Sequence, residues 1–261
     1  MKSIIRCFFL FLILILFFGC DRLVKNTLKE KRSNLYFGLT EKQKKDREFY
    51  YSISNLAYRV EEINERLMNG QNPNSCYGEC GWIESNPLLL ISQYHYDIYY
   101  REKYGQDIPE PTPNILVFNL LIDYGADINM YPYIYIIVYT RTDHRKRSNK
   151  EELLYIEGSN KILKEFLEKG ADPNAKGNHK AFDWQTYDDN LSYEGFQKMC
   201  KEPDATSPLY EAIKKGMLWE SQVNLLLEYG AILDESCLEA AKLSGDKEMI
   251  DKITSLINNG E

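Results

Sequence analysis

Cysteines are the residues of this chain best suited to chemistry, because its 261 residues include only three histidines. Cys76 and Cys80 are separated by three residues, and Cys200 lies far from both in the sequence. Outside a reducing cytosol such thiols pair, so we expect a disulfide between Cys76 and Cys80, or between one of them and Cys200. A zinc site is disfavoured, since there is no second closely spaced cysteine pair and no nearby histidine. The spacing also differs from that of thioredoxin-type redox sites.

Sequence motifs of common enzyme classes are missing from the chain. It contains no glycine-rich phosphate loop, no G-x-S-x-G and no H-E-x-x-H. Its formal net charge of −7 argues against nucleic acid as a partner, because phosphate binding needs a basic face. We therefore expect neither catalytic residues nor a metal or cofactor, and no nucleic-acid binding.

The first residues have the pattern of an export signal. Lys2 and Arg6 precede or border an uncharged apolar run at 7–18. Twelve apolar residues are too few for a membrane-spanning helix, which needs about 20, but they suit the core of a secretory signal. We expect the chain to leave the cytosol.

The end of this run resembles the lipobox of bacterial lipoproteins, in which a small residue precedes an acylated cysteine. Gly19 and Cys20 match that motif, whereas Phe17 and Phe18 depart from its usual residues. The resemblance implies removal of residues 1–19, acylation of Cys20, and attachment to a lipid bilayer of the bacterial cell envelope. Residues 20–45 are polar and rich in lysine, and we expect them to form a tether. An uncleaved anchor helix and ordinary cleavage without a lipid remain alternatives.

One pattern recurs along the rest of the chain: an apolar run with helical spacing, then glycine, then a short polar turn. The copies are ILVFNLLIDYGADIN at 115–129, ILKEFLEKGADPN at 162–174, QVNLLLEYGAILD at 222–234 and a degenerate VEEINERLMNGQNPN at 60–74. A glycine directly after a helix predicts a left-handed residue that ends it. The Asp or Asn that follows predicts a turn held by side-chain hydrogen bonds.

A second element precedes another helix in each copy. Residues 207–212 read SPLYEA, which predicts a serine cap and a proline in the first helical turn. Asn86-Pro87 and Tyr131-Pro132 are looser versions. Together the two elements resemble ankyrin repeats, with their T-P-L-H-x-A opening and GADxN closing. The resemblance implies an all-α ankyrin-repeat solenoid over residues 46–261, with four to five degenerate repeats of paired helices and β-turn fingers.

The repeats are longer than those of the family, whose period is about 33 residues. Successive glycines lie 55, 45 and 60 residues apart. We therefore expect long insertions near 92–113 and 140–159, and a long finger at 175–206. Long loops on a rigid scaffold often carry function.

The two ends of the repeat region are predicted as helix pairs. Residues 46–58 and 60–69 form the first pair, and 234–257 the last. In the last pair one face is apolar at helical spacing, and it comprises Cys237, Leu238, Ala240, Ala241, Met249, Ile250, Ile253 and Ile257. We expect this face to be core, with Cys237 as a buried thiol.

Aromatic side chains cluster in the fingers, where ankyrin proteins contact their partners. The candidates for partner binding are Tyr77, Trp82, Trp184, Tyr187 and Tyr193. For Trp184, and for nearby Phe196, packing of the insertion itself is an equal alternative. The resemblance implies a membrane-anchored, non-catalytic protein–protein interaction module that inhibits or protects an envelope or secreted protein. Two other functions stay open: a self-associating structural lipoprotein, and a ligand or metal sensor that uses the tyrosine- and cysteine-rich insertions.

Overall fold

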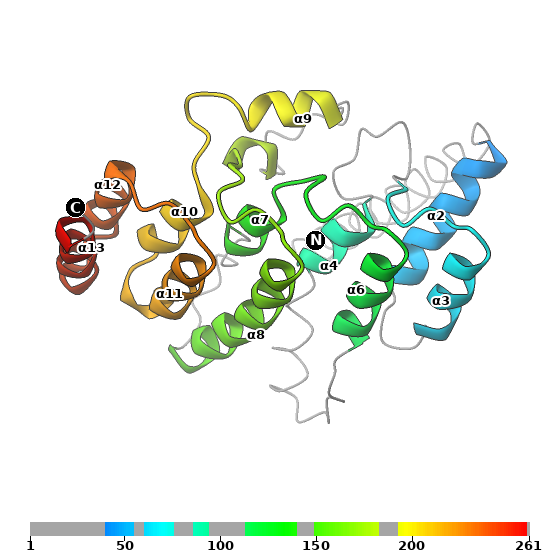
Figure 1. Cartoon of the computed structure of the whole chain (residues 1–261), viewed down its shortest axis with the longest axis horizontal. Helices are drawn as coiled ribbons and strands as arrows, with labels where there is room; N and C mark the ends of the chain where they lie inside the picture. The colour runs from blue at the N-terminus through cyan, green and yellow to red at the C-terminus, as the bar shows by residue number, and fades with distance from the viewer. Residues whose placement is uncertain are drawn as a thin grey trace, which may run out of the picture. The chain divides into compact units, whose positions relative to one another are not determined.

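The computed structural model describes residues 40–54, 60–75, 86–93, 113–139, 149–182 and 193–259 (Figure 1). These residues are predominantly helical, and within them β-structure is limited to one isolated bridge between Gly177 and Thr206. The expected all-α class is therefore confirmed. None of the helices described is both long enough and apolar enough to cross a bilayer. By internal contacts the chain divides into two units, Met1–Lys45 and Asp46–Glu261.

The described helices form consecutive pairs, which Figure 1 shows side by side, and all of them lie in the second unit except the first five residues of α2. The pairs are α2 (Glu41–Ser54) with α3 (Val60–Met68), α4 (Pro87–Gln93) with α6 (Pro113–Asp123), α7 (Tyr133–Tyr139) with α8 (Asn149–Glu168), α10 (Pro208–Lys214) with α11 (Glu220–Glu228), and α12 (Glu235–Ser244) with α13 (Lys247–Asn259). The first helices of neighbouring pairs contact one another, α4 with α7, α7 with α10 and α10 with α12. Among the second helices, α3 contacts α6 and α8 contacts α11.

Each second helix up to α11 ends at the glycine that the sequence predicts. At the end of α8, the Gly170 N–H donates to the Leu167 carbonyl and the Ala171 N–H to the Phe166 carbonyl, both at 3.0 Å. This pair of hydrogen bonds is the Schellman motif, which needs a left-handed residue at the glycine. The φ angle of Gly170 is +88°. Equivalent pairs of bonds close the helices before Gly70, Gly125 and Gly230.

An asparagine four residues after each of the first three glycines links its turn to the next one. The Asn129 side chain donates from Nδ2 to the Gly170 carbonyl at 3.1 Å and accepts at Oδ1 from the Asp172 N–H at 2.8 Å. Asn74 makes the same two bonds to Gly125 and Asp127, at 3.0 and 2.7 Å. Asn174 makes them to Gly230 and Ile232, at 3.1 and 2.8 Å. We call these three side chains the asparagine bridges.

Two of the first helices, α10 and α4, begin with caps that the sequence predicts. Ser207 has extended backbone before α10, and its hydroxyl accepts a hydrogen bond from the Tyr210 N–H. At α4 the Asn86 side chain accepts from the Leu89 N–H at 3.1 Å and from the Tyr133 hydroxyl at 3.0 Å. Asn86 therefore caps its own helix and also joins it to the next pair.

The core runs between the two rows of helices. Phe166 of α8 packs against Phe118 of α6 and Tyr133 of α7, with ring centroids 4.5 and 5.4 Å away. In the last pair Cys237, Ala240, Ala241, Met249 and Ile253 are fully buried, as predicted, while Leu238, Ile250 and Ile257 are partly buried. Burial raises the pKa of the Cys237 thiol to about 11.

Two helices extend beyond the predicted ranges. Helix α2 begins at Glu41 instead of residue 46, because Thr40 and Gln43 form a capping box. The Gln43 N–H donates to the Thr40 hydroxyl at 3.2 Å, and the Thr40 N–H donates to Gln43 Oε1 at 2.8 Å. Helix α8 begins at Asn149, so the second half of the insertion expected at 140–159 is an extension of that helix.

A lysine joins α10 to the end of α7. Lys215 Nζ donates to the Val138 carbonyl and lies 3.8 Å from the centroid of the Trp219 ring. Burial lowers the pKa of this ammonium to about 7, although the carboxylates of Glu211 and Glu152 oppose the shift. A folded-state pKa below the unfolded value of about 10.5 means that the unfolded chain binds more protons between pH 7 and 10.5.

Lys215 should therefore make the free energy of unfolding rise with pH above about 7, because unfolding there requires the uptake of a proton, which becomes more costly as the pH rises. Below pH 7 the lysine is protonated in both states, and its contribution is constant. The measurement is urea unfolding of the native chain and the Lys215→Met variant at pH 6, 7, 8 and 9. The difference between the two should grow in favour of the native chain from pH 7 to 9. The matched control is Lys214→Met, at an exposed neighbour; a pH-independent difference for Lys215→Met would contradict the assignment.

Candidate protein-binding groove

The long finger predicted at 175–206 is closed at its base by the isolated β-bridge. The Gly177 N–H donates to the Thr206 carbonyl at 3.1 Å, and the Thr206 N–H returns a bond at 3.0 Å. Gly177 lies directly against the buried ring of Tyr135 in α7, because a Cβ built on it would be 2.0 Å from Tyr135 Cδ1. Only glycine fits at this contact, so the finger leaves the helix stack at a fixed point.

Asn178 organises the first turn of the finger. Its buried side chain donates from Nδ2 to Asp204 Oδ1 at 2.8 Å and to the Met199 carbonyl at 3.2 Å. Its Oδ1 accepts from the Lys180 N–H at 3.0 Å. The Lys180 ammonium forms an ion pair with Asp204, which lowers the pKa of that carboxyl. One amide therefore ties the two ends of the finger together.

Helix α9 (Tyr193–Met199) of the same finger is held over the turn that precedes α7. Phe196 on α9 is 1% exposed, and its ring centroid lies 5.6 Å from that of Tyr131. Cys200, directly after α9, is half-buried, and burial raises the pKa of its thiol to about 11. The thiol is therefore uncharged at neutral pH.

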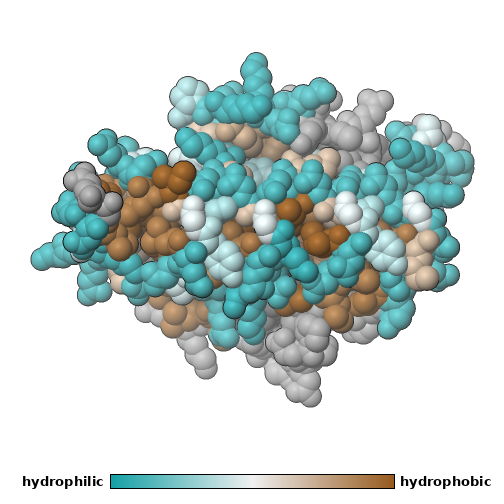
Figure 2. Space-filling view, in the orientation of Figure 1, coloured by the Kyte–Doolittle hydropathy of each residue, from teal (hydrophilic) through white to brown (hydrophobic). Residues whose placement is uncertain are grey.

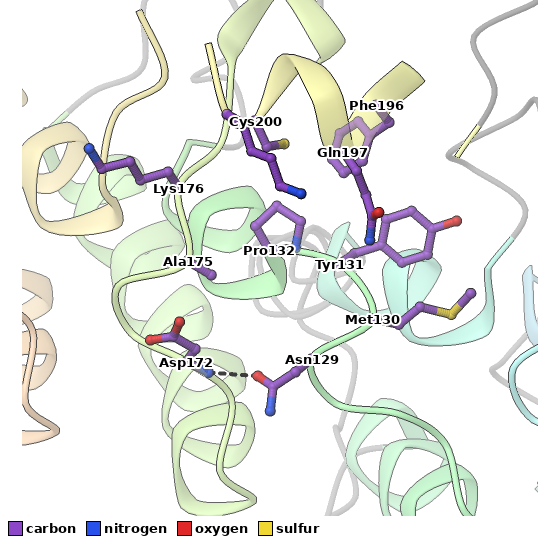
Figure 3. Close-up of a pocket in the computed structure, with 11 residues that line it drawn as sticks. Asn129, Met130, Tyr131, Pro132, Asp172, Ala175, Lys176, Phe196, Gln197 and Cys200 are labelled. Carbon is purple, nitrogen blue, oxygen red and sulfur yellow. Dashed lines mark hydrogen bonds between the residues drawn. The ribbon is translucent and has the colours of Figure 1, made fainter. Parts of the chain in front are cut away.

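A groove of 270 Å³ lies between α9 and the two turns beneath it (Figure 3). Tyr131, Pro132 and Phe196 form its apolar floor, and Figure 3 shows Gln197 extending from α9 toward Tyr131. The remaining lining residues are Asn129, Met130, Asp172, Ala175, Lys176, Cys200 and Lys201. We call this site the α9 groove.

Two pairs of polar residues in the α9 groove differ in their partners. Asn129 and Asp172 are engaged in the helix stack, since Asn129 is an asparagine bridge and Asp172 Oδ1 accepts from the Asn174 N–H at 2.8 Å. Lys176 and Lys201 are exposed, and neither ammonium has a partner among the residues that the structure describes. The groove therefore combines an apolar floor with two available cations at its edge.

Most of the side chains predicted to bind a partner lie outside the described ranges. This holds for Tyr77, Trp82, Trp184 and Tyr187, and for the lipidation residue Cys20. Tyr193 is the first residue of α9, but its side chain is not among those described. These assignments stay predictions.

The predicted disulfide also stays a prediction. Cys200 carries a free thiol in the structure, while Cys76 and Cys80 lie outside the described residues. Within the described part of the chain no group of three or more His, Cys, Asp or Glu is arranged to hold a metal ion.

Sequence reasoning missed Tyr131 and Pro132 as site residues. The sequence predicts Pro132 only as part of a helix opening, because the groove that it lines together with α9 joins segments more than 60 positions apart. For Phe196 the structure favours packing of the insertion, since the ring is buried against Tyr131.

Comparison of the chain with models of protein families, with curated proteins and with solved structures found no match. The structural features that bear on function are therefore the α9 groove and the repeated turns.

Replacing Gly177 with alanine should lower the free energy of unfolding by about 1–3 kcal/mol, because the new methyl group overlaps the Tyr135 ring. Equilibrium urea unfolding measures the loss. The control is a double-mutant cycle with Tyr135→Leu, which removes the ring that the methyl group meets. Gly177→Ala should cost less in the Tyr135→Leu background than in the native chain, and strictly additive losses would contradict the close contact.

Proposed function

We propose that this chain is a membrane-tethered ankyrin-repeat protein that binds another protein at its turn side and catalyses no reaction. The resemblance of its repeats to the ankyrin family suggests this fold. Stacked helix pairs, left-handed glycines at +85 to +88° and the asparagine bridges support it. Repeat scaffolds of this kind act by presenting an extended surface.

The α9 groove is the observation that carries the proposal. It lies on the turns, which the asparagine bridges hold in register, and its cover is an insertion that the repeat itself does not need. Figure 2 shows that α9 and the turns present mainly hydrophilic side chains on the viewed face. An apolar floor under a polar rim is the arrangement of a protein-binding patch.

The α9 groove is small and open. It measures 270 Å³ and lies at the surface, so one or two side chains of a larger partner would fill it. This size is compatible with protein binding, and the ligand-sensor alternative stays open.

The tether gives the binding surface its place in the cell. With residues 1–19 removed and Cys20 acylated, several acyl chains would satisfy the requirement for two membrane signals. Residues 21–39 would then separate the lipid from the capped start of α2 at Thr40. The partner is accordingly an envelope or secreted protein that the chain inhibits or protects.

In-cell photo-crosslinking tests the proposal directly. A benzoylphenylalanine placed at Gln197, on the rim of the α9 groove, should give a discrete adduct of higher mass that mass spectrometry identifies as one other protein. The matched control places the same group at Leu218, which is 41% exposed in the connection between α10 and α11. That position should give no such adduct.

Two outcomes would contradict the proposal. An adduct made only of two copies of this chain would favour the self-associating structural protein. Equal labelling from positions 197 and 218, or none from 197, would show that the groove is not the binding surface.

A further inference from the structure

We propose that the α9 groove binds an extended acidic segment of its partner, in which an apolar side chain is flanked by carboxylates. This inference rests on the proposed function and adds the chemistry of the bound segment. It follows from which groups of the groove are already engaged and which remain available.

The floor selects an apolar side chain. Tyr131 is 4% exposed and Phe196 1% exposed, so their rings are fixed by the core and present only a small part of their surface to the groove. Pro132 is buried beside them, and the neighbouring Cys200 thiol is uncharged, since burial raises its pKa to about 11. A charged group placed on this floor would lose hydration without gaining a partner.

The edge selects negative charge. Lys176 lies at the start of the finger and Lys201 two residues after α9, so two separated positions of the finger bring a cation to the same groove. Lys180, on the same finger, differs because its ammonium pairs with Asp204. Figure 3 shows the Lys176 side chain at one side of the groove, extended away from Tyr131 and Phe196.

Asp172 is the carboxylate among the lining residues, and it does not cancel both lysines. Its Oδ1 accepts the Asn174 N–H, and its own N–H donates to Asn129, as the dashed line in Figure 3 marks. The hydrogen bonds of the turn hold this residue on the helix stack. The lining residues therefore carry one net positive charge within a chain whose formal net charge is −7.

The overall negative charge does not prevent this recognition. At physiological ionic strength charges are screened beyond about 8 Å, so a bound carboxylate responds chiefly to the groups it touches. Net charge affects the rate of approach, whereas the groove contacts decide which segment stays bound.

The test uses three fluorescein-labelled heptapeptides that share a central Leu-Phe and differ in their flanks. One carries Glu and Asp, the second Gln and Asn, and the third Lys. Fluorescence anisotropy with the purified chain should show the acidic peptide binding most tightly. The double variant Lys176→Gln/Lys201→Gln should weaken the acidic peptide about 3- to 10-fold, the effect of two exposed ion pairs. It should leave the amide peptide unchanged.

Lys198→Gln is the matched control, because Lys198 is exposed on α9 but does not line the groove. Equal affinity for the acidic and amide peptides would overturn the inference, as would an equal loss in Lys198→Gln, preference for the lysine peptide, or no binding at all. Each of these results leaves the proposed function standing if position 197 still crosslinks to a partner. Loss of that crosslink is the separate sign that the proposed function has failed.

Discussion

The asparagine bridges are the interaction on which the rest of this structure depends. A helix pair in a repeat protein cannot bury its apolar face alone, so it must meet its neighbour in one register. Asn74, Asn129 and Asn174 set that register by offering a donor and an acceptor to the next turn at 2.7–3.1 Å. A side-chain amide supplies both functions at once, which neither aspartate nor serine does in the same geometry.

The turn after α11 has a helix cap in place of an asparagine bridge. Asp234 occupies the position of the bridging asparagines, but it precedes the final helix pair and accepts from the Ser236 N–H to cap α12. A carboxylate has no N–H to donate, so Asp234 cannot make the two-bond bridge and serves as a helix cap instead.

Fixed turns also explain how the finger at 175–206 is tolerated. Lengthening a loop costs only a logarithmic closure term, and the bridge between Gly177 and Thr206 returns the chain to the start of α10. The contact of Gly177 with Tyr135 fixes where the finger leaves, and Phe196 fixes where α9 comes to rest. The α9 groove results from these two anchor points on a rigid row of turns.

Local features of the fold could be predicted from the sequence, because they depend on neighbouring residues. Gly170 and its equivalents end helices, Ser207 caps one, and Cys237 and Ala241 share a buried face. The groove could not be predicted, because its floor joins Tyr131 to Phe196 across 65 positions. The environment of Lys215 escaped prediction for the same reason, since Val138 lies 77 residues away. The capping box at Thr40 and Gln43 is also a local sequence pattern, and the start of α2 that it sets was not predicted.

Amide hydrogen exchange, followed residue by residue by NMR, tests the central role of the bridges most directly. The Asp127, Asp172 and Ile232 residues are exposed on turns, yet each N–H donates to an asparagine of the preceding turn. These three amides should exchange slowly in the native chain, and Asn129→Ala should accelerate Asp172 most while Asp127 stays protected. Rapid exchange of all three in the native chain, or an equal effect of Asn129→Ala on Asp127 and Asp172, would contradict the account.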